Sequence, residues 1–155
     1  MTDQVVEFLP EAAQHTLETM FFSVPDVVSA APRRPAGDLI AATLAFHGSH
    51  HGQLGLLVSE PLARTFAANF FGCDEDSEIA SGHVTGVIAE LANMICGAAL
   101  TRRESSGAFD LSAPRTFRLA AAEKSPEFTS GATSACCLEF PEGTLVLYLS
   151  FGTPL

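Results

Sequence analysis

A carboxylate and a carboxamide stand three residues apart in the middle of the chain, and a glycine lies four residues away on either side. These residues are Glu90 and Asn93, flanked by Gly86 and Gly97. At about 100° per residue, all four fall on one face of a helix, and the apolar residues of the segment gather on another face. Glycine inside a helix costs about 1 kcal/mol relative to alanine. Two glycines on one face therefore predict a bare surface that something approaches closely.

The spacing also has a plainer interpretation. Glutamate and asparagine are common on protein surfaces, and such pairs usually form a solvated helix face. A site at Glu90 and Asn93 therefore needs support from the rest of the sequence.

The hydrophobic pattern predicts an α+β fold, in which an antiparallel β-sheet built of hairpins is covered by long helices. A helical pattern covers 5–22, and Pro10 indicates that the helix proper begins there. The segment 24–35 reads as a connection, and Ser59 is expected to cap the next helix. The remaining predicted elements are strands at 39–47, 53–58, 115–121, 132–140 and 144–151, and helices at 62–71 and 82–97. We expect one domain over 1–155, with an N-terminal helix and connection at 1–35 and the sheet and site helix at 36–155.

Charge and composition exclude several classes of function. The formal net charge is −10, from 18 acidic and 8 basic side chains. Such a field repels phosphate backbones, so nucleic acid is not expected as a partner. The N-terminus lacks a basic signal-peptide region, and no uninterrupted apolar run approaches about 18 residues, so we expect a cytoplasmic protein without membrane insertion.

Cysteines and histidines give only weak indications of a metal. The four cysteines form no C-x-x-C pair and are expected to be reduced, small hydrophobic residues. His47, His50 and His51 cluster at one turn, which could suit a metal, but no cysteine or carboxylate stands at a supporting interval. A polar hairpin tip is the favoured interpretation, and no metal site is predicted.

The segment Glu90–Gly97, ELANMICG, resembles the E-L-x-N-M-I-x-G helix of the CheX and CheC family of chemotaxis phosphatases. The first helix, the first hairpin and a downstream proline also match in order, over about 17–150. The matching segments are Leu17–Met20, Gly48–Leu56 and Leu111–Pro114. The single E-x-x-N copy is similar to CheX, whereas CheC-type proteins generally carry two.

The resemblance implies hydrolysis of the aspartyl phosphate on a CheY-like receiver domain of a response regulator, in chemotaxis or other two-component signalling. Asn93 would hold the attacking water, and Glu90 would pair with a lysine of the partner. Gly86, Gly97 and Pro114 would contact the partner. Mg²⁺ would lie in the receiver domain, so no cofactor is expected in this chain. A homodimer is also expected from the resemblance.

One departure keeps a second function open. The family usually has Asp or Ser where this chain has Gly86, so the alternative is a non-catalytic docking module for a response regulator or a flagellar-switch-type partner. A third hypothesis is an oligomerisation domain that uses exposed sheet edges. That hypothesis predicts assembly that is indifferent to changes at Glu90 or Asn93.

Overall fold

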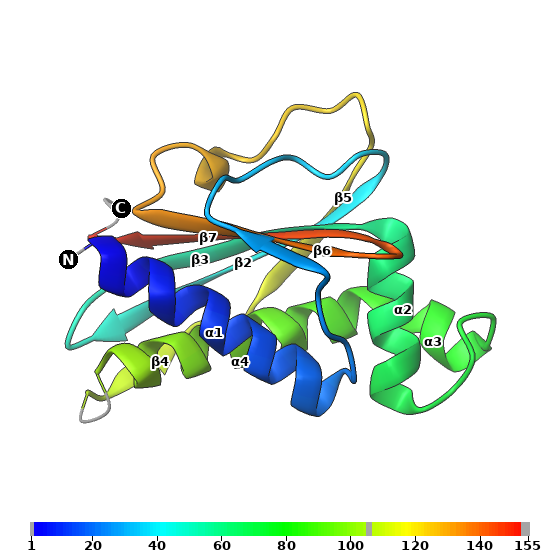
Figure 1. Cartoon of the computed structure of the whole chain (residues 1–155), viewed down its shortest axis with the longest axis horizontal. Helices are drawn as coiled ribbons and strands as arrows, with labels where there is room; N and C mark the ends of the chain where they lie inside the picture. Colours follow the sequence, from blue (N-terminus) through cyan, green and yellow to red (C-terminus); the bar gives the residue numbers. More distant parts are fainter. Residues whose placement is uncertain (1, 105–106, 153–155) are drawn as a thin grey trace.

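Helices cover one face of a twisted sheet in the computed structural model, which describes residues 2–104 and 107–152, with side chains from Phe8 onward (Figure 1). The helical elements are α1 (Thr2–Met20), α2 (Glu60–Phe71), α3 (Glu78–Gly82), α4 (Val84–Arg103) and the 3-10 turn η1 (Glu127–Thr129). The strands are β1 (Val27–Ser29), β2 (Leu39–Gly48), β3 (Gly52–Ser59), β4 (Phe109–Leu111), β5 (Arg115–Leu119), β6 (Ser134–Phe140) and β7 (Gly143–Phe151).

The seven strands form one antiparallel sheet in the order β1-β6-β7-β3-β2-β4, with β5 also paired to β2. The two hairpins, β2–β3 and β6–β7, lie side by side because β3 pairs with β7 at the centre. The strands β4 and β5 pair with successive parts of β2, so together they form one interrupted edge. The predicted α+β class with a hairpin-built antiparallel sheet is confirmed.

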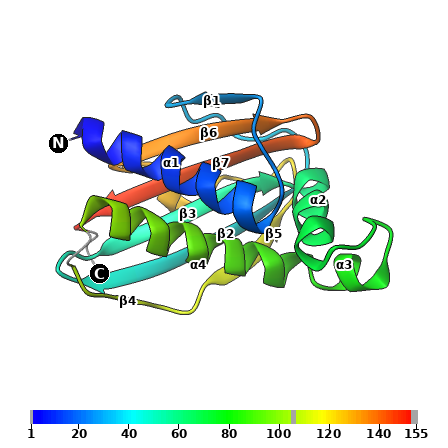
Figure 2. The ribbon, with the colours of Figure 1, turned by 60° about the horizontal axis from the view of Figure 1, so that its bottom comes forward.

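Strand alternation divides the core between the two faces of the sheet. On β3, Leu54, Leu56 and Val58 face the helices, whereas Leu57 faces the other side. That other side is covered by η1, whose Phe128 packs there. The helix side holds the larger core, since α1 and α4 lie next to each other and pack together (Figure 2).

The prediction that α1 begins at Pro10 is wrong. The helix begins at Thr2 and continues through Pro10, although proline removes one hydrogen bond of the helix ladder. Leu9, Ala13 and Leu17 are fully buried on the face that packs against α4 and β6. This packing holds the segment helical on both sides of the proline.

The site helix also differs in its bounds. The short α3 precedes it and is capped by Ser77, whose Oγ accepts a hydrogen bond from the Ala80 N–H at 3.1 Å. His83 then leaves helical geometry, with ψ near 17°, and α4 begins at Val84 and continues to Arg103. The predicted helical segment 82–97 therefore starts two residues before α4 and lies within it from Val84 onward.

Two short strands lie in segments that the sequence indicated as connections. β1 lies within 24–35, and β4 lies in the polar segment after α4. Ser59 is the N-cap residue of α2, as the sequence indicates, but its side chain does not form the cap. Its Oγ makes no capping hydrogen bond to α2 and instead accepts one from the Thr144 N–H at 3.0 Å, which ties β3 to β7.

Within the described residues, α4 is the one helix that is long and apolar enough to span a membrane. Half of its apolar stretch is buried inside the protein. Because α4 packs against α1, α2 and the sheet, its hydrophobicity is accounted for by this core position.

Candidate functional site

The helix α4 turns one face into the core and presents a narrow polar stripe outward. Its buried residues are Val84, Val87, Ile88, Leu91, Ala92, Ile95, Cys96, Ala99 and Leu100. On the opposite side, Gly86 and Glu90 are exposed, and Asn93 and Gly97 are half-buried. The helix thus brings the four residues of the predicted contact surface onto one outward face.

The two glycines leave the helix backbone open along this stripe. A Cβ atom placed on Gly86 or Gly97 would meet no heavy atom within 4 Å outside the local helix backbone. Packing inside the chain therefore does not require glycine at either position. Glycine weakens a helix, and at these two positions it leaves a bare helix surface beside Glu90 and Asn93.

The side chains of Glu90 and Asn93 are available for interactions with a partner. Among the residues whose side chains the structure describes, neither makes a side-chain hydrogen bond or an ion pair. A carboxylate offers only acceptors, whereas a carboxamide both donates and accepts. The stripe can therefore bind a cation through Glu90 and orient a water molecule through Asn93.

Pro114 lies on a different element from the stripe. It is half-buried in the connection between β4 and β5, two strands that both contact α4. Ser112 fixes this connection to β2, because its N–H donates to the Ala45 carbonyl at 2.8 Å and its Oγ accepts from the Ala45 N–H at 2.8 Å. Pro114 is thus held at the sheet edge beside α4.

His47 near the end of β2 and His50 in the β2–β3 turn lie close to separate carboxylates. The Nε2 atom of His50 lies 3.1 Å from Oε2 of Glu104, and that of His47 lies 3.8 Å from Oδ2 of Asp110. In the part of the chain that the structure describes, no three His, Cys, Asp or Glu residues are grouped as a metal site would need. This geometry agrees with a polar hairpin tip.

Burial makes two of the cysteines unreactive. Desolvation raises the pKa of the Cys96 thiol and of the Cys136 thiol to about 12, with a smaller contribution from Cys137 at the latter. The structure records the four cysteines as free. Their side chains therefore pack as small apolar groups, as the sequence indicates.

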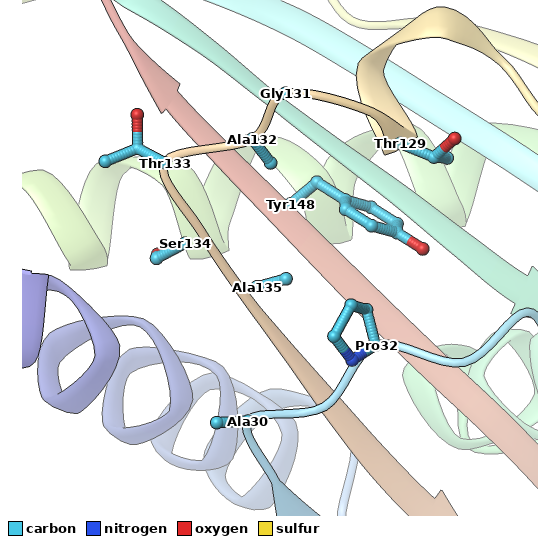
Figure 3. Close-up of a pocket in the computed structure, with 9 residues that line it drawn as sticks. All are labelled: Ala30, Pro32, Thr129, Gly131, Ala132, Thr133, Ser134, Ala135 and Tyr148. Carbon is cyan, nitrogen blue, oxygen red and sulfur yellow. The ribbon is translucent and has the colours of Figure 1, made fainter.

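A cleft of about 360 Å³ lies on the sheet face opposite the helices (Figure 3). Figure 3 shows the Tyr148 ring between Thr129 and Pro32. Most of the other lining residues are small, and Tyr148 belongs to the core cluster of this far face. The cleft and the α4 stripe are thus separate features on opposite sides of the sheet.

Sequence reasoning assigned no role to His83, which precedes α4. It is the N-cap residue of α4 and lies seven residues before Glu90, or about two helical turns. Its ring contacts Phe71, with the ring centroids 5.7 Å apart. The seven-residue spacing of His83, Glu90 and Gly97 could have drawn attention to His83. Its contact with Phe71 could not be predicted, because that contact depends on how α2 packs against the start of α4.

The fold and the stripe together define a structural class of protein, in which an antiparallel sheet of paired hairpins carries a helix with a polar outward face. Residues 40–140 match the family model described as Chemotaxis phosphatase CheX. The chain therefore belongs to the CheX family of chemotaxis phosphatases. No curated protein matches it in sequence.

Solved structures show the same fold at low sequence identity. A CheC-like superfamily protein from Shewanella sp. PV-4 is 18% identical, with a TM-score of 0.73 and coverage of 99% of this chain and 100% of that one. CheX from Desulfovibrio desulfuricans is 17% identical, with a TM-score of 0.68 and coverage of 95% and 98%. A chain of the CheX–CheY–BeF3–Mg²⁺ complex from Borrelia burgdorferi is 17% identical, with a TM-score of 0.70 and coverage of 94% and 96%.

Proposed function

We propose that the chain is a phosphatase that hydrolyses the aspartyl phosphate of a CheY-like receiver domain. Membership of the CheX family supports this function, as does the similarity to a chain from a CheX–CheY complex. The observation that carries the proposal is the outward stripe of α4, where Glu90 and Asn93 stand without partners among the described side chains and between two open glycines.

Asn93 positions the attacking water. Its carboxamide accepts one hydrogen of the water and donates to the water oxygen or to a phosphoryl oxygen, which holds the water in line with the scissile bond. The water oxygen bonds to phosphorus as the bond between phosphorus and the aspartyl oxygen breaks. The products are inorganic phosphate and a free carboxylate, and the proton of the water leaves with phosphate or solvent.

Glu90 fixes the register of docking. One turn before Asn93, its carboxylate pairs with a lysine beside the partner's phosphorylation site through a charge-assisted hydrogen bond. Gly86 and Gly97 let the two backbones approach, and Pro114 contacts the partner from the neighbouring sheet edge. The Mg²⁺ ion belongs to the acidic pocket of the receiver, and this chain contributes no metal ligand.

A non-catalytic docking module is the second candidate function. The observation in its favour is Gly86, which stands where the family usually has Asp or Ser. In that case the same stripe binds a response regulator or a flagellar-switch-type partner without turnover.

Phosphate release separates the two functions. Receiver domains from the same organism are charged with acetyl phosphate, and phosphate is followed with the wild-type chain and with Asn93→Ala. The phosphatase accelerates release from one receiver, and the variant loses that acceleration while still binding. If wild-type chain binds a receiver and leaves its phosphate release unchanged, the chain is a docking module.

A further inference from the structure

Three residues form an exposed, largely apolar corner where α2 and α3 meet the beginning of α4. The Phe71 side chain is 41% exposed and Ile79 is 55% exposed. The ring of His83 lies against Phe71, with a centroid distance of 5.7 Å and an interplanar angle of 67°. Phe71, Ile79 and His83 together form this aromatic corner.

The imidazole in this corner has a fixed orientation. Nδ1 of His83 lies 2.9 Å from the backbone carbonyl oxygen of Ile79. Because a carbonyl only accepts hydrogen bonds, Nδ1 carries the hydrogen. In the neutral ring, Nε2 is then the acceptor, and the ring is held edge-on to Phe71.

A row of aromatic rings supports the corner from the core. The centroid of the buried Phe66 ring lies 5.9 Å from that of Phe21, and the Phe21 ring stacks on Phe70 with a centroid distance of 5.3 Å. The Phe70 and Phe71 ring centroids are 5.5 Å apart. The row therefore begins at fully buried residues and ends at an exposed one. A ring held in this way loses little conformational freedom when a partner covers it, which is a property of interface anchors.

The corner lies within the footprint of a domain docked on the stripe. His83, the N-cap residue of α4, is seven residues before Glu90, a distance of about 10 Å along the axis. A standard interface covers about 800 Å² of each partner, which corresponds to a disc of about 16 Å radius. A receiver domain centred on Glu90 therefore reaches the corner, and Figure 2 shows α2 and α3 at that end of α4.

Four exposed carboxylates lie in the segment of chain between Phe71 and Ile79. Asp74, Glu75 and Asp76 lie in the connection between α2 and α3, and Glu78 begins α3. An apolar centre with a charged rim is the usual anatomy of a protein interface. The negative rim favours a partner surface that carries basic residues around an apolar side chain.

We propose that the aromatic corner is a second docking point for the phosphorylated receiver domain, and that it receives an apolar side chain from a basic surface next to the phosphorylation site. The inference rests on the proposed function. The corner sets affinity and partner choice without entering the reaction, because His83 lies ten residues, or about 15 Å, from Asn93 along the helix.

Binding measurements on matched phenylalanine variants test the inference. The receiver that the wild-type chain dephosphorylates is activated with beryllofluoride and Mg²⁺ and titrated with wild-type chain, Phe71→Ala and Ile79→Ala. Phe117→Ala is the control, since Phe117 is 38% exposed on β5 and pairs with Ala41, whose side chain packs on the sheet face away from the helices. The corner variants are expected to raise the dissociation constant about tenfold and to raise KM with kcat unchanged, and the control is expected to match wild type.

The outcomes separate this inference from the proposed function. If the wild-type chain acts on no receiver, the proposed function fails, and the inference fails with it. If the wild-type chain dephosphorylates a receiver and both corner variants bind it as tightly as wild type, only the inference is overturned. It is also overturned if Phe71→Ala changes the mass of the free protein, because the corner would then bind a second copy. If Phe71→Ala lowers the melting temperature, weaker binding by that variant could reflect lost stability, and Ile79→Ala then provides the test.

Discussion

Glu90 and Asn93 lie one turn apart on the same exposed helix face, yet their chemistry assigns them different tasks. Asn93→Ala removes the group that orients water and leaves the contact with a cationic partner in place. We expect turnover to fall on the order of 10²-fold or more, with little change in the dissociation constant. Single-turnover kinetics and binding titration on the same receiver measure the two effects separately.

Glu90→Gln tests the docking role, because it removes the charge and keeps the size of the side chain. We expect the dissociation constant to rise about tenfold at low salt and the difference from wild type to shrink as added salt screens the pair. Glu127→Gln is the control of equal charge, since Glu127 is exposed on η1 at the far face of the sheet. Equal effects of the two substitutions would show that only net charge matters.

At the scale of the helix, the open glycines of α4 give opposite predictions for stability and function. Gly86→Ala and Gly97→Ala should each raise the free energy of unfolding by about 0.5–1 kcal/mol, because alanine is the better helix former and its Cβ meets no clash. Binding of the activated receiver should weaken, since the methyl group stands between the two backbones. Urea denaturation and titration of the same variants measure both quantities.

Two results would contradict the role assigned to Gly86 and Gly97. If Gly86→Ala and Gly97→Ala stabilise the protein and bind the receiver as wild type does, close backbone approach is not part of docking. Loss of stability would show instead that the glycines serve the fold.

The sequence predicted the long strands well and the short strands poorly. The strands predicted at 39–47 and 144–151 are long apolar runs, and they agree with β2 and β7 to within one residue at each end. β1 and β4 have three residues each, which is too short for any period to emerge, and they exist only because β6 and β2 offer edges. Pro10 was a misleading signal, because tertiary packing along α1 outweighed its local preference.

The arrangement of the candidate site residues was partly predictable from the sequence. Helical spacing alone placed Gly86, Glu90, Asn93 and Gly97 on one face, and the structure shows that face turned outward. The contact of Phe71 with His83 could not be predicted from the sequence. It brings together the end of α2 and the start of α4, which are separated in the chain by α3.

For the whole molecule, buried thiols predict how stability depends on alkaline pH. Burial raises the pKa of Cys96 and of Cys136 to about 12 from an ordinary value of 9.0. Between these values the unfolded chain loses the two protons and the folded chain keeps them, so stability falls as the pH rises. The expected slope is about 1.4 kcal/mol per pH unit for each thiol, and urea denaturation between pH 9 and 12 measures it.

Cys96→Ala is the matching variant for this slope. It should lose the contribution of one thiol above pH 9, apart from a uniform loss of packing at every pH. An unchanged slope would show that Cys96 does not carry the alkaline sensitivity.

The sheet has an edge that suits pairing with a second copy. In β1, Val27 and Val28 are exposed, and among the described strands β1 pairs with β6 alone. We expect a homodimer of the 16.3 kDa chain through edge pairing, and Val28→Lys should produce the monomer, because a charge on an edge strand opposes pairing. Light scattering after size exclusion reads the mass, with Asn93→Ala as the control that stays dimeric.

The central claim is that α4 carries a phosphatase site, and the decay of a phosphorylated receiver tests it most directly. The receiver is charged with acetyl phosphate, freed of the reagent, and mixed with a substoichiometric amount of the chain. The account predicts that wild-type chain discharges the whole receiver pool and that Asn93→Ala leaves the decay at its intrinsic rate. The account would be contradicted if the receiver decayed at its intrinsic rate while wild-type chain was bound to it. Full activity of Asn93→Ala would also contradict the account.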